Sequence, residues 1–208
     1  HAGGGRRPNM VPDYAEATLS GSQEAQLTAI RLLKRFWDKN VTFEVTDTGI
    51  TVRAYGKSAH GSTPALGDNA VARLARALQT LGLPDSEAWL DFVAKTVDTT
   101  GSALGIAHSD AVAGALTSNL GILTYTDKGT VQLTFNIRYP VTWNIEALIA
   151  ANRPVLEENG WVLAEYHDQP PLYVPLDKEP VNTLLRVYRE ATGDTESQPG
   201  TMGGGTYA

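Results

Sequence analysis

The alternation of apolar and polar residues predicts several β-strands along this chain. Ala15, Ala17 and Leu19 alternate with polar neighbours, which is typical of a strand with one buried face. Asp47-Thr48-Gly49 and Asp127-Lys128-Gly129 each separate two segments of this kind and predict hairpin turns. The strands predicted in this way are residues 14–20, 42–46, 50–55, 120–126, 130–138 and 161–167.

Apolar residues at helical spacing predict helices between these strands. Leu27, Ile30 and Leu33 recur every three residues, and Ser22 precedes them as an N-cap. The predicted helices are residues 23–39, 69–81, 145–159 and 179–192, and the segment 84–119 looks helical in its first part and irregular afterwards. Strand-pair and helix units in this order predict an α+β fold, an antiparallel sheet with helices on one face, of ferredoxin-like type.

A proline-rich stretch at residues 169–175 interrupts this pattern and predicts a domain boundary. Residues 1–171 then form the main domain, and residues 172–208, with the last predicted helix, belong to a neighbouring domain. The chain does not begin with Met and stops within a glycine-rich turn, so we expect it to be a piece of a longer protein.

Composition and charge narrow the possible functions. A hydrophobic fraction of 42% and a charged fraction of 19% are typical of a globular domain. The formal net charge of -6 leaves no basic surface for nucleic acid, and no apolar run reaches the roughly 18 residues that a membrane span needs. The absence of Cys excludes disulfides and thiolate-bound metals, and together with the lack of a signal peptide it favours a cytoplasmic protein.

Among the polar residues, His60 and Arg138 are the main candidates for a functional site. His60 lies in a loop rich in Gly, Ser and Pro, and an exposed imidazole can donate a hydrogen bond to a developing oxyanion. Arg138 ends a predicted strand, and a guanidinium fixed there can bind a carboxylate through two hydrogen bonds. From these residues alone, a loop histidine bonded to nearby backbone and a solvated arginine are the simpler interpretations.

Two further features give weaker signals. The Gly-Gly-Gly-Thr turn at residues 203–206 offers backbone N–H groups to an anion, although a flexible linker has the same composition. Glu157-Glu158 is the kind of pair that two-zinc hydrolases use, but Asn159-Gly160 follows it as a helix stop, so we interpret it as a solvated helix end. No HxD, HExxH or HxH motif is present, and no metal site is predicted within this chain.

Several short motifs occur in an informative order. They are NMVP at residues 9–12, GKSAHGSTP at 56–64 with GDNA at 67–70, NIRYP at 136–140, and GGGTY at 203–207. Together they resemble the lid domain of the PepV-type dipeptidases, which belong to the zinc aminoacylase and carnosinase superfamily of metallopeptidases. The resemblance extends from about Asn9 to Ala208.

The resemblance implies a mechanism for a longer enzyme. Two zinc ions in its catalytic domain would hold a bridging water, and a glutamate there would take the proton of that water. His60 matches the lid histidine that stabilises the tetrahedral oxyanion, and Arg138 matches the arginine that binds the C-terminal carboxylate of a dipeptide. The residues that would complete the substrate pocket are Asn9, Gly204, Gly205 and Thr206.

The same resemblance implies that the chain contains parts of two domains with different roles. Residues 1–171 would be the lid, of dimerisation-domain type, and residues 172–208 a stub of the zinc catalytic domain. The zinc ligands of the family lie in segments before His1 and after Ala208, so we expect the chain alone to bind no zinc and to be inactive. The long interval between His60 and Arg138 implies a monomeric parent, whereas the isolated lid is expected to self-associate through exposed apolar surface.

Two alternatives remain open at this point. The same histidine and arginine would serve a deacylase of N-acyl amino acids, such as acetylornithine or succinyl-diaminopimelate. A stand-alone regulatory or dimerisation module with a ferredoxin-like sheet would also have this pattern of strands and helices.

Overall fold

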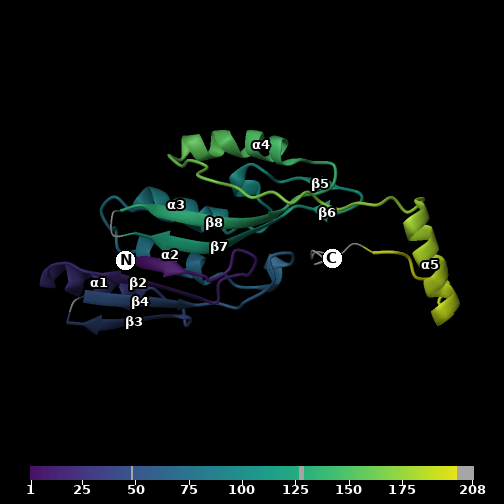
Figure 1. The fold of residues 1–208 in the computed structure, drawn as a ribbon. Helices are drawn as coiled ribbons and strands as arrows, with labels where there is room; N and C mark the ends of the chain where they lie inside the picture. Colours follow the sequence, from purple (N-terminus) through teal and green to yellow (C-terminus); the bar gives the residue numbers. More distant parts are fainter. Residues whose placement is uncertain (48, 127–128, 201–208) are drawn as a thin grey trace.

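A six-stranded antiparallel sheet forms the centre of the fold, with the strand order β3-β4-β2-β1-β7-β8 (Figure 1). The structure, a computed structural model, describes residues 1–47, 49–126 and 129–200. The strands of the sheet are β1 (Ala2–Gly4), β2 (Tyr14–Leu19), β3 (Val41–Thr46), β4 (Gly49–Tyr55), β7 (Thr117–Tyr125) and β8 (Val131–Arg138). The predicted α+β class is therefore confirmed.

The helices also follow the predicted order. They are α1 (Gln23–Arg35), α2 (Ala70–Gln79), α3 (Glu87–Thr96), α4 (Ile145–Glu158) and α5 (Glu179–Thr192). Ser22 caps α1 as predicted, because its hydroxyl accepts a hydrogen bond from the Ala25 backbone N–H. Helix α1 ends four residues earlier than predicted, since Phe36 already has an extended backbone conformation. The short elements are η1 (Pro64–Leu66), η2 (Ser102–Leu104), and the hairpin of β5 (Ser109–Asp110) and β6 (Gly114–Ala115).

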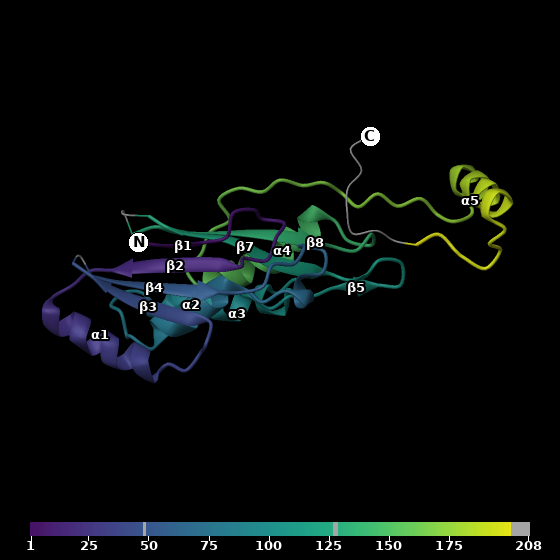
Figure 2. The ribbon, with the colours of Figure 1, turned by 90° about the horizontal axis from the view of Figure 1, so that it is seen from below.

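The hydrophobic core lies between the sheet and helix α2. Seven of the ten residues of α2 are buried, and the helix packs on the inward side chains of β2 and β4. On β2 these are Ala15 and Ala17, whose small side chains let the helix approach closely. Figure 2 shows α1, α2 and α3 on one side of the strands.

A second apolar cluster extends the core beneath α4. Its buried members are Phe92, Leu104, Ile106, Leu116 and Leu148. Phe135 and Ile137 of β8 pack against this cluster, and Phe135 also packs against the first one. Because strand side chains alternate between faces, Asn136 and Arg138 must point to the opposite, helix-free face of the sheet.

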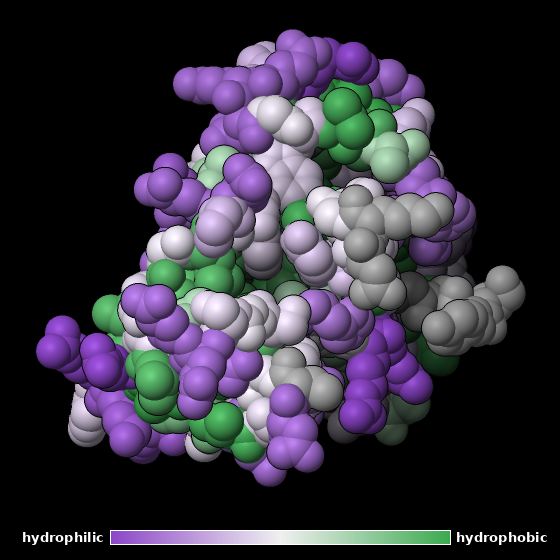
Figure 3. All heavy atoms as spheres, turned by 90° about the vertical axis from the view of Figure 1, so that its left-hand side faces the viewer, coloured by the Kyte–Doolittle hydropathy of each residue, from purple (hydrophilic) through white to green (hydrophobic). Residues whose placement is uncertain are grey.

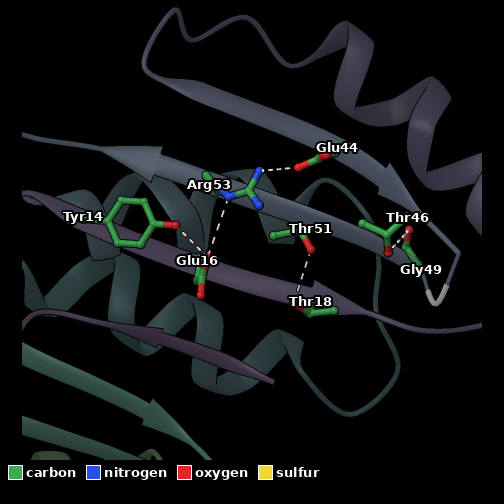
Figure 4. Close-up of polar contacts among 8 residues, drawn as sticks. All are labelled: Tyr14, Glu16, Thr18, Glu44, Thr46, Gly49, Thr51 and Arg53. Atoms are coloured by element: carbon green, nitrogen blue, oxygen red, sulfur yellow. Dashed lines mark hydrogen bonds and ion pairs between the residues drawn. The ribbon is translucent and has the colours of Figure 1, made fainter.

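The helix-free face of β2, β4 and β3 is polar. Arg53 donates a hydrogen bond to Glu44 at 2.9 Å and lies 3.8 Å from Glu16, with Thr18 and Thr51 paired beside them (Figure 4). Water and salt screen exposed ion pairs of this kind. They indicate the solvent side of the sheet and add little to its stability.

Strand β1 was not predicted, although it lies in the middle of the sheet. It pairs with β2 on one side and β7 on the other. A side chain at Gly4 would place its Cβ 2.5 Å from the Cβ of Ala15 and 2.8 Å from Val71. The strand therefore needs glycine for close contact, and three residues rich in glycine carry no periodic signal.

The predicted strand at residues 161–167 is wrong. The segment has no regular secondary structure, and Val162 is 84% exposed. Its first residue, Trp161, stacks on Phe92 with ring centroids 4.9 Å apart, and its N–H bonds to the Leu156 carbonyl. These contacts turn the chain back on α4, so the apolar run does not pair with the edge of the sheet.

A hydrogen bond links Asp168, in the segment after α4, to Tyr139 at the end of β8. The Tyr139 hydroxyl donates to the Asp168 carboxylate at 2.7 Å. Burial of the ring, together with this bond to a carboxylate, raises the pKa of Tyr139 to about 12. The protonated phenol is thus favoured in the folded state.

We expect Tyr139→Phe to lower the free energy of unfolding by about 1 kcal/mol at neutral pH, because one partly buried hydrogen bond is lost. The folded-state pKa lies above the unfolded value of about 10, so the contribution of Tyr139 is complete below pH 10 and declines as the pH rises toward 12. Melting curves of both proteins from pH 8 to pH 11.5 would measure this. A difference that stays constant across this range would contradict the assignment.

Exposed apolar side chains are concentrated in the C-terminal part. Leu172 is 90% exposed and Leu184 of α5 is 70% exposed, and none of the residues of α5 is buried. At the opposite end of the molecule the apolar residues form separate patches with hydrophilic residues between them (Figure 3). None of the described helices combines the length and hydropathy that a bilayer crossing requires.

Candidate functional site

Two loops that lie far apart in the sequence pair with each other on the helix-free side of the sheet. Met10 and His60 form an isolated antiparallel bridge. On either side of it, the Val11 N–H donates to the Ala59 carbonyl and the Gly61 N–H donates to the Asn9 carbonyl, both at 2.8 Å. The pairing places Asn9 opposite Gly61, the residue after His60, and both Asn9 and His60 are exposed.

The His60 ring is oriented by Ser62. Its Nδ1 atom lies 2.7 Å from the Ser62 hydroxyl and accepts a hydrogen bond from the Ser62 backbone N–H at 3.4 Å. A backbone N–H can only donate, so this contact favours the tautomer in which Nδ1 accepts and the ring proton is on Nε2. The exposed side of the imidazole therefore presents an N–H donor.

Arg138 joins this group through Asn136. The Arg138 Nε–H donates to the Asn136 Oδ1 atom at 3.4 Å. That same oxygen lies against Gly61, where an added Cβ would be only 2.6 Å away from it. Gly61 is also held on the β7 side, because the Thr117 hydroxyl donates to its carbonyl at 3.3 Å.

We expect Gly61→Ala to destabilise the domain by about 1–3 kcal/mol, the usual cost of forcing atoms into a filled site. The new methyl group would meet the Asn136 oxygen at 2.6 Å and the Asn9 carbonyl at 3.1 Å. Gly21→Ala is a matched control, since its Cβ would make only an ordinary contact at 3.5 Å with Ala25. Equal melting temperatures for the two variants would show that Gly61 is not tightly enclosed.

Backbone hydrogen bonds and ion pairs hold together the two ends of the loop that carries His60, at Lys57 and Asp68. Lys57 and Asp68 close the loop through two backbone hydrogen bonds of 2.8 Å. The Arg73 guanidinium of α2 pairs with the carboxylates of Asp68 and Asp38, and the bond to Asp68 raises the pKa of Arg73. Because Arg73 lies on a buried helix, the loop is anchored to the rigid core of the domain.

Two of the residues named from the sequence, Asn9 directly and Arg138 through Asn136, are thus connected to Gly61, which follows the third, His60. Gly204, Gly205 and Thr206 lie outside the described residues. Glu157 and Glu158 are exposed at the end of α4, which agrees with their interpretation as a helix end. The sequence did not single out Asn119, Asn136 or Ser62, although each contacts this group.

The donors in this group do not fit a zinc site. Zinc is bound by imidazole, carboxylate or thiolate groups, whereas the side-chain partner of His60 is the Ser62 hydroxyl. Among the described residues there is no group of three or more His, Asp or Glu side chains that could hold a metal ion. The arrangement is suited to hydrogen bonding with an oxyanion and a carboxylate.

Comparison with known proteins finds one matching family model and several similar proteins. Residues 48–160 match the model of the peptidase dimerisation domain. A protein of Staphylococcus saprophyticus is 32% identical over 212 residues, and one of Staphylococcus epidermidis is 34% identical over 210 residues. Each match covers 98% of this chain and 44% of the relative, so the chain spans less than half the length of these relatives. Both carry the name "Putative dipeptidase", as does a Staphylococcus aureus protein that is 31% identical over 210 residues.

Proposed function

The chain belongs to the peptidase dimerisation domain family, and from this premise we propose that it is the substrate-binding lid of a metallodipeptidase. Membership of this family agrees with the resemblance seen in the sequence motifs. The proposed reaction is hydrolysis of the peptide bond of a dipeptide with a free C-terminal carboxylate. The names of the staphylococcal relatives support this choice of substrate.

The observation that supports the proposal is that Asn136 contacts both Arg138 and Gly61, the residue that follows His60. Nδ1 of His60 is occupied by Ser62, which leaves the Nε2–H to donate to an oxyanion. Arg138 is connected to the same loop through Asn136 and carries the positive charge that a carboxylate requires. The two groups would hold the two ends of the reacting part of a dipeptide, its scissile carbonyl and its carboxylate.

The metal chemistry would come from the rest of a longer protein. When bound there, two zinc ions would supply the activated water, and we propose that their ligands lie in the rest of that protein. We propose that residues 1–171 are the lid and residues 172–208 the beginning of the catalytic domain. The proposal is supported by α5, which has no buried residue and follows a segment without regular secondary structure.

The family model describes a dimerisation domain, which supports self-association of this part of the molecule. We nevertheless propose that the full-length enzyme is a monomer. The long interval between His60 and Arg138 supports this, because it resembles the extended lid with which one chain supplies its own histidine. Light scattering on the full-length enzyme would measure its mass directly.

Assays on the chain and on the full-length protein from the same gene test the proposed function. We expect the full-length protein to bind two zinc ions and to cleave dipeptides, and the chain alone to do neither. N-acyl amino acids such as acetylornithine are the comparison substrates, because a deacylase would prefer them. Preference for the N-acyl substrates, or metal-dependent turnover by the chain alone, would overturn the proposal.

A further inference from the structure

We propose that Asn119 and Asn136 form a positioning pair that holds the substrate-facing residues of the lid in register; this inference rests on the proposed function. The two asparagines lie directly opposite each other on β7 and β8. Asn136 points to the helix-free face, and side chains opposite each other in an antiparallel pair share a face. The pair therefore lies beneath the two loops that carry Asn9 and His60.

Asn119 holds the Asn9 loop. It is only 2% exposed, and its Nδ2 atom donates to the Pro8 carbonyl at 2.7 Å and to the Met10 carbonyl at 3.0 Å. A side-chain amide has two N–H groups, and both are used here. Because the two carbonyls flank Asn9, its backbone is fixed on both sides.

Asn136 holds the other two residues. Its Oδ1 atom accepts the hydrogen bond from Arg138 and touches Gly61, the residue that follows His60. The Gly61 N–H in turn donates to Asn9, which closes a ring of contacts through both loops and both strands. A displacement of about 1 Å in such an arrangement costs an enzyme about 100-fold in rate.

The first test is Asn119→Asp in the full-length enzyme, which keeps the size of the side chain and removes both N–H donors. Asn152→Asp is the matched control, because Asn152 donates a similar 2.8 Å hydrogen bond to the Leu104 carbonyl near α4. We expect Asn119→Asp to lower kcat/KM at least tenfold more than the control does, and to lower the melting temperature as well, because its buried carboxylate faces two carbonyl oxygens. Equal losses of activity would overturn the positioning role.

A second measurement does not depend on activity. The N–H groups of Val11 and Gly61 bond across the two loops, so we expect Asn119→Asp to speed their hydrogen exchange at least tenfold while the amides of β8 keep their rates. Unchanged exchange at Val11 and Gly61 would overturn the proposal. If wild-type enzyme fails to cleave dipeptides, the proposed function fails, and the exchange rates still decide whether Asn119 holds the loops.

Asn136 provides an independent pair of variants should Asn119→Asp not fold. Asn136→Ser keeps a neutral oxygen that can accept a hydrogen bond, whereas Asn136→Leu keeps the approximate shape and removes the acceptor. We expect the serine variant to raise KM for dipeptides by no more than about threefold and the leucine variant to raise it at least tenfold. Equal KM values for the two variants would show that this oxygen does not position Arg138.

Discussion

His60→Ala in the full-length enzyme should lower kcat by about 100- to 1,000-fold, or about 2.7–4 kcal/mol, the usual cost of removing one oxyanion donor. The reason lies in the orientation of the ring. Ser62 occupies Nδ1, so the exposed Nε2–H is the atom available to the oxyanion. KM should change little, because the oxyanion forms only in the transition state.

The zinc content of the enzyme separates this role from that of a metal ligand. We expect the His60→Ala enzyme to retain all its zinc by elemental analysis. His108→Ala is the matched control, because His108 stacks on Trp143 and contacts Thr142, in contacts that do not include the His60 loop. An unchanged kcat for the His60 variant, or a loss of zinc, would remove the assigned role.

Arg138→Ala should lower kcat/KM for dipeptides by about 30- to 1,000-fold, which corresponds to about 2–4 kcal/mol for a lost charged partner. The loss should appear mainly in KM, because the carboxylate is present in the substrate as well as in the transition state. Arg138→Lys should recover only part of it, since an ammonium keeps the charge and lacks the planar pair of donors.

Substrates without the carboxylate show whether Arg138 binds that group. Wild-type enzyme should prefer a dipeptide to its C-terminal amide, and Arg138→Ala should largely lose this preference. Arg53→Ala is a suitable control, because Arg53 lies on the polar surface of β4 and pairs with Glu44. An undiminished preference in the Arg138 variant would assign the carboxylate to another residue.

Local patterns in the sequence account for most of the fold. The alternation in β2 corresponds to the buried Ala15 and Ala17, and the helix predicted at residues 69–81 corresponds to α2, seven of whose residues are buried. Strand β1 could not be found in this way, since its pairing depends on close contact between Gly4, Ala15 and Val71, which are far apart in sequence. The error at residues 161–167 has a similar origin: stacking of Trp161 on Phe92 overrides the strand propensity of an apolar run.

Part of the candidate site could likewise be predicted from the sequence, and part could not. His60 and Arg138 could be named because a loop histidine and a strand-end arginine occur within recognisable motifs. Asn119 could have been noticed in the sequence, because it is a polar residue within an apolar strand. A buried amide of this kind needs hydrogen-bond partners. Those partners are the carbonyls of Pro8 and Met10, more than 100 residues away, which only the fold brings together.

A crystal structure of the full-length enzyme with a phosphinic dipeptide analogue would test the central claim most directly. Its phosphinyl oxygens imitate the tetrahedral oxyanion, and its carboxylate imitates the C-terminus of the substrate. We predict that the Nε2 atom of His60 lies within about 3.2 Å of a phosphinyl oxygen and that the Arg138 guanidinium binds the carboxylate at a similar distance. An analogue held by the catalytic domain alone, with both side chains in solvent, would contradict the account.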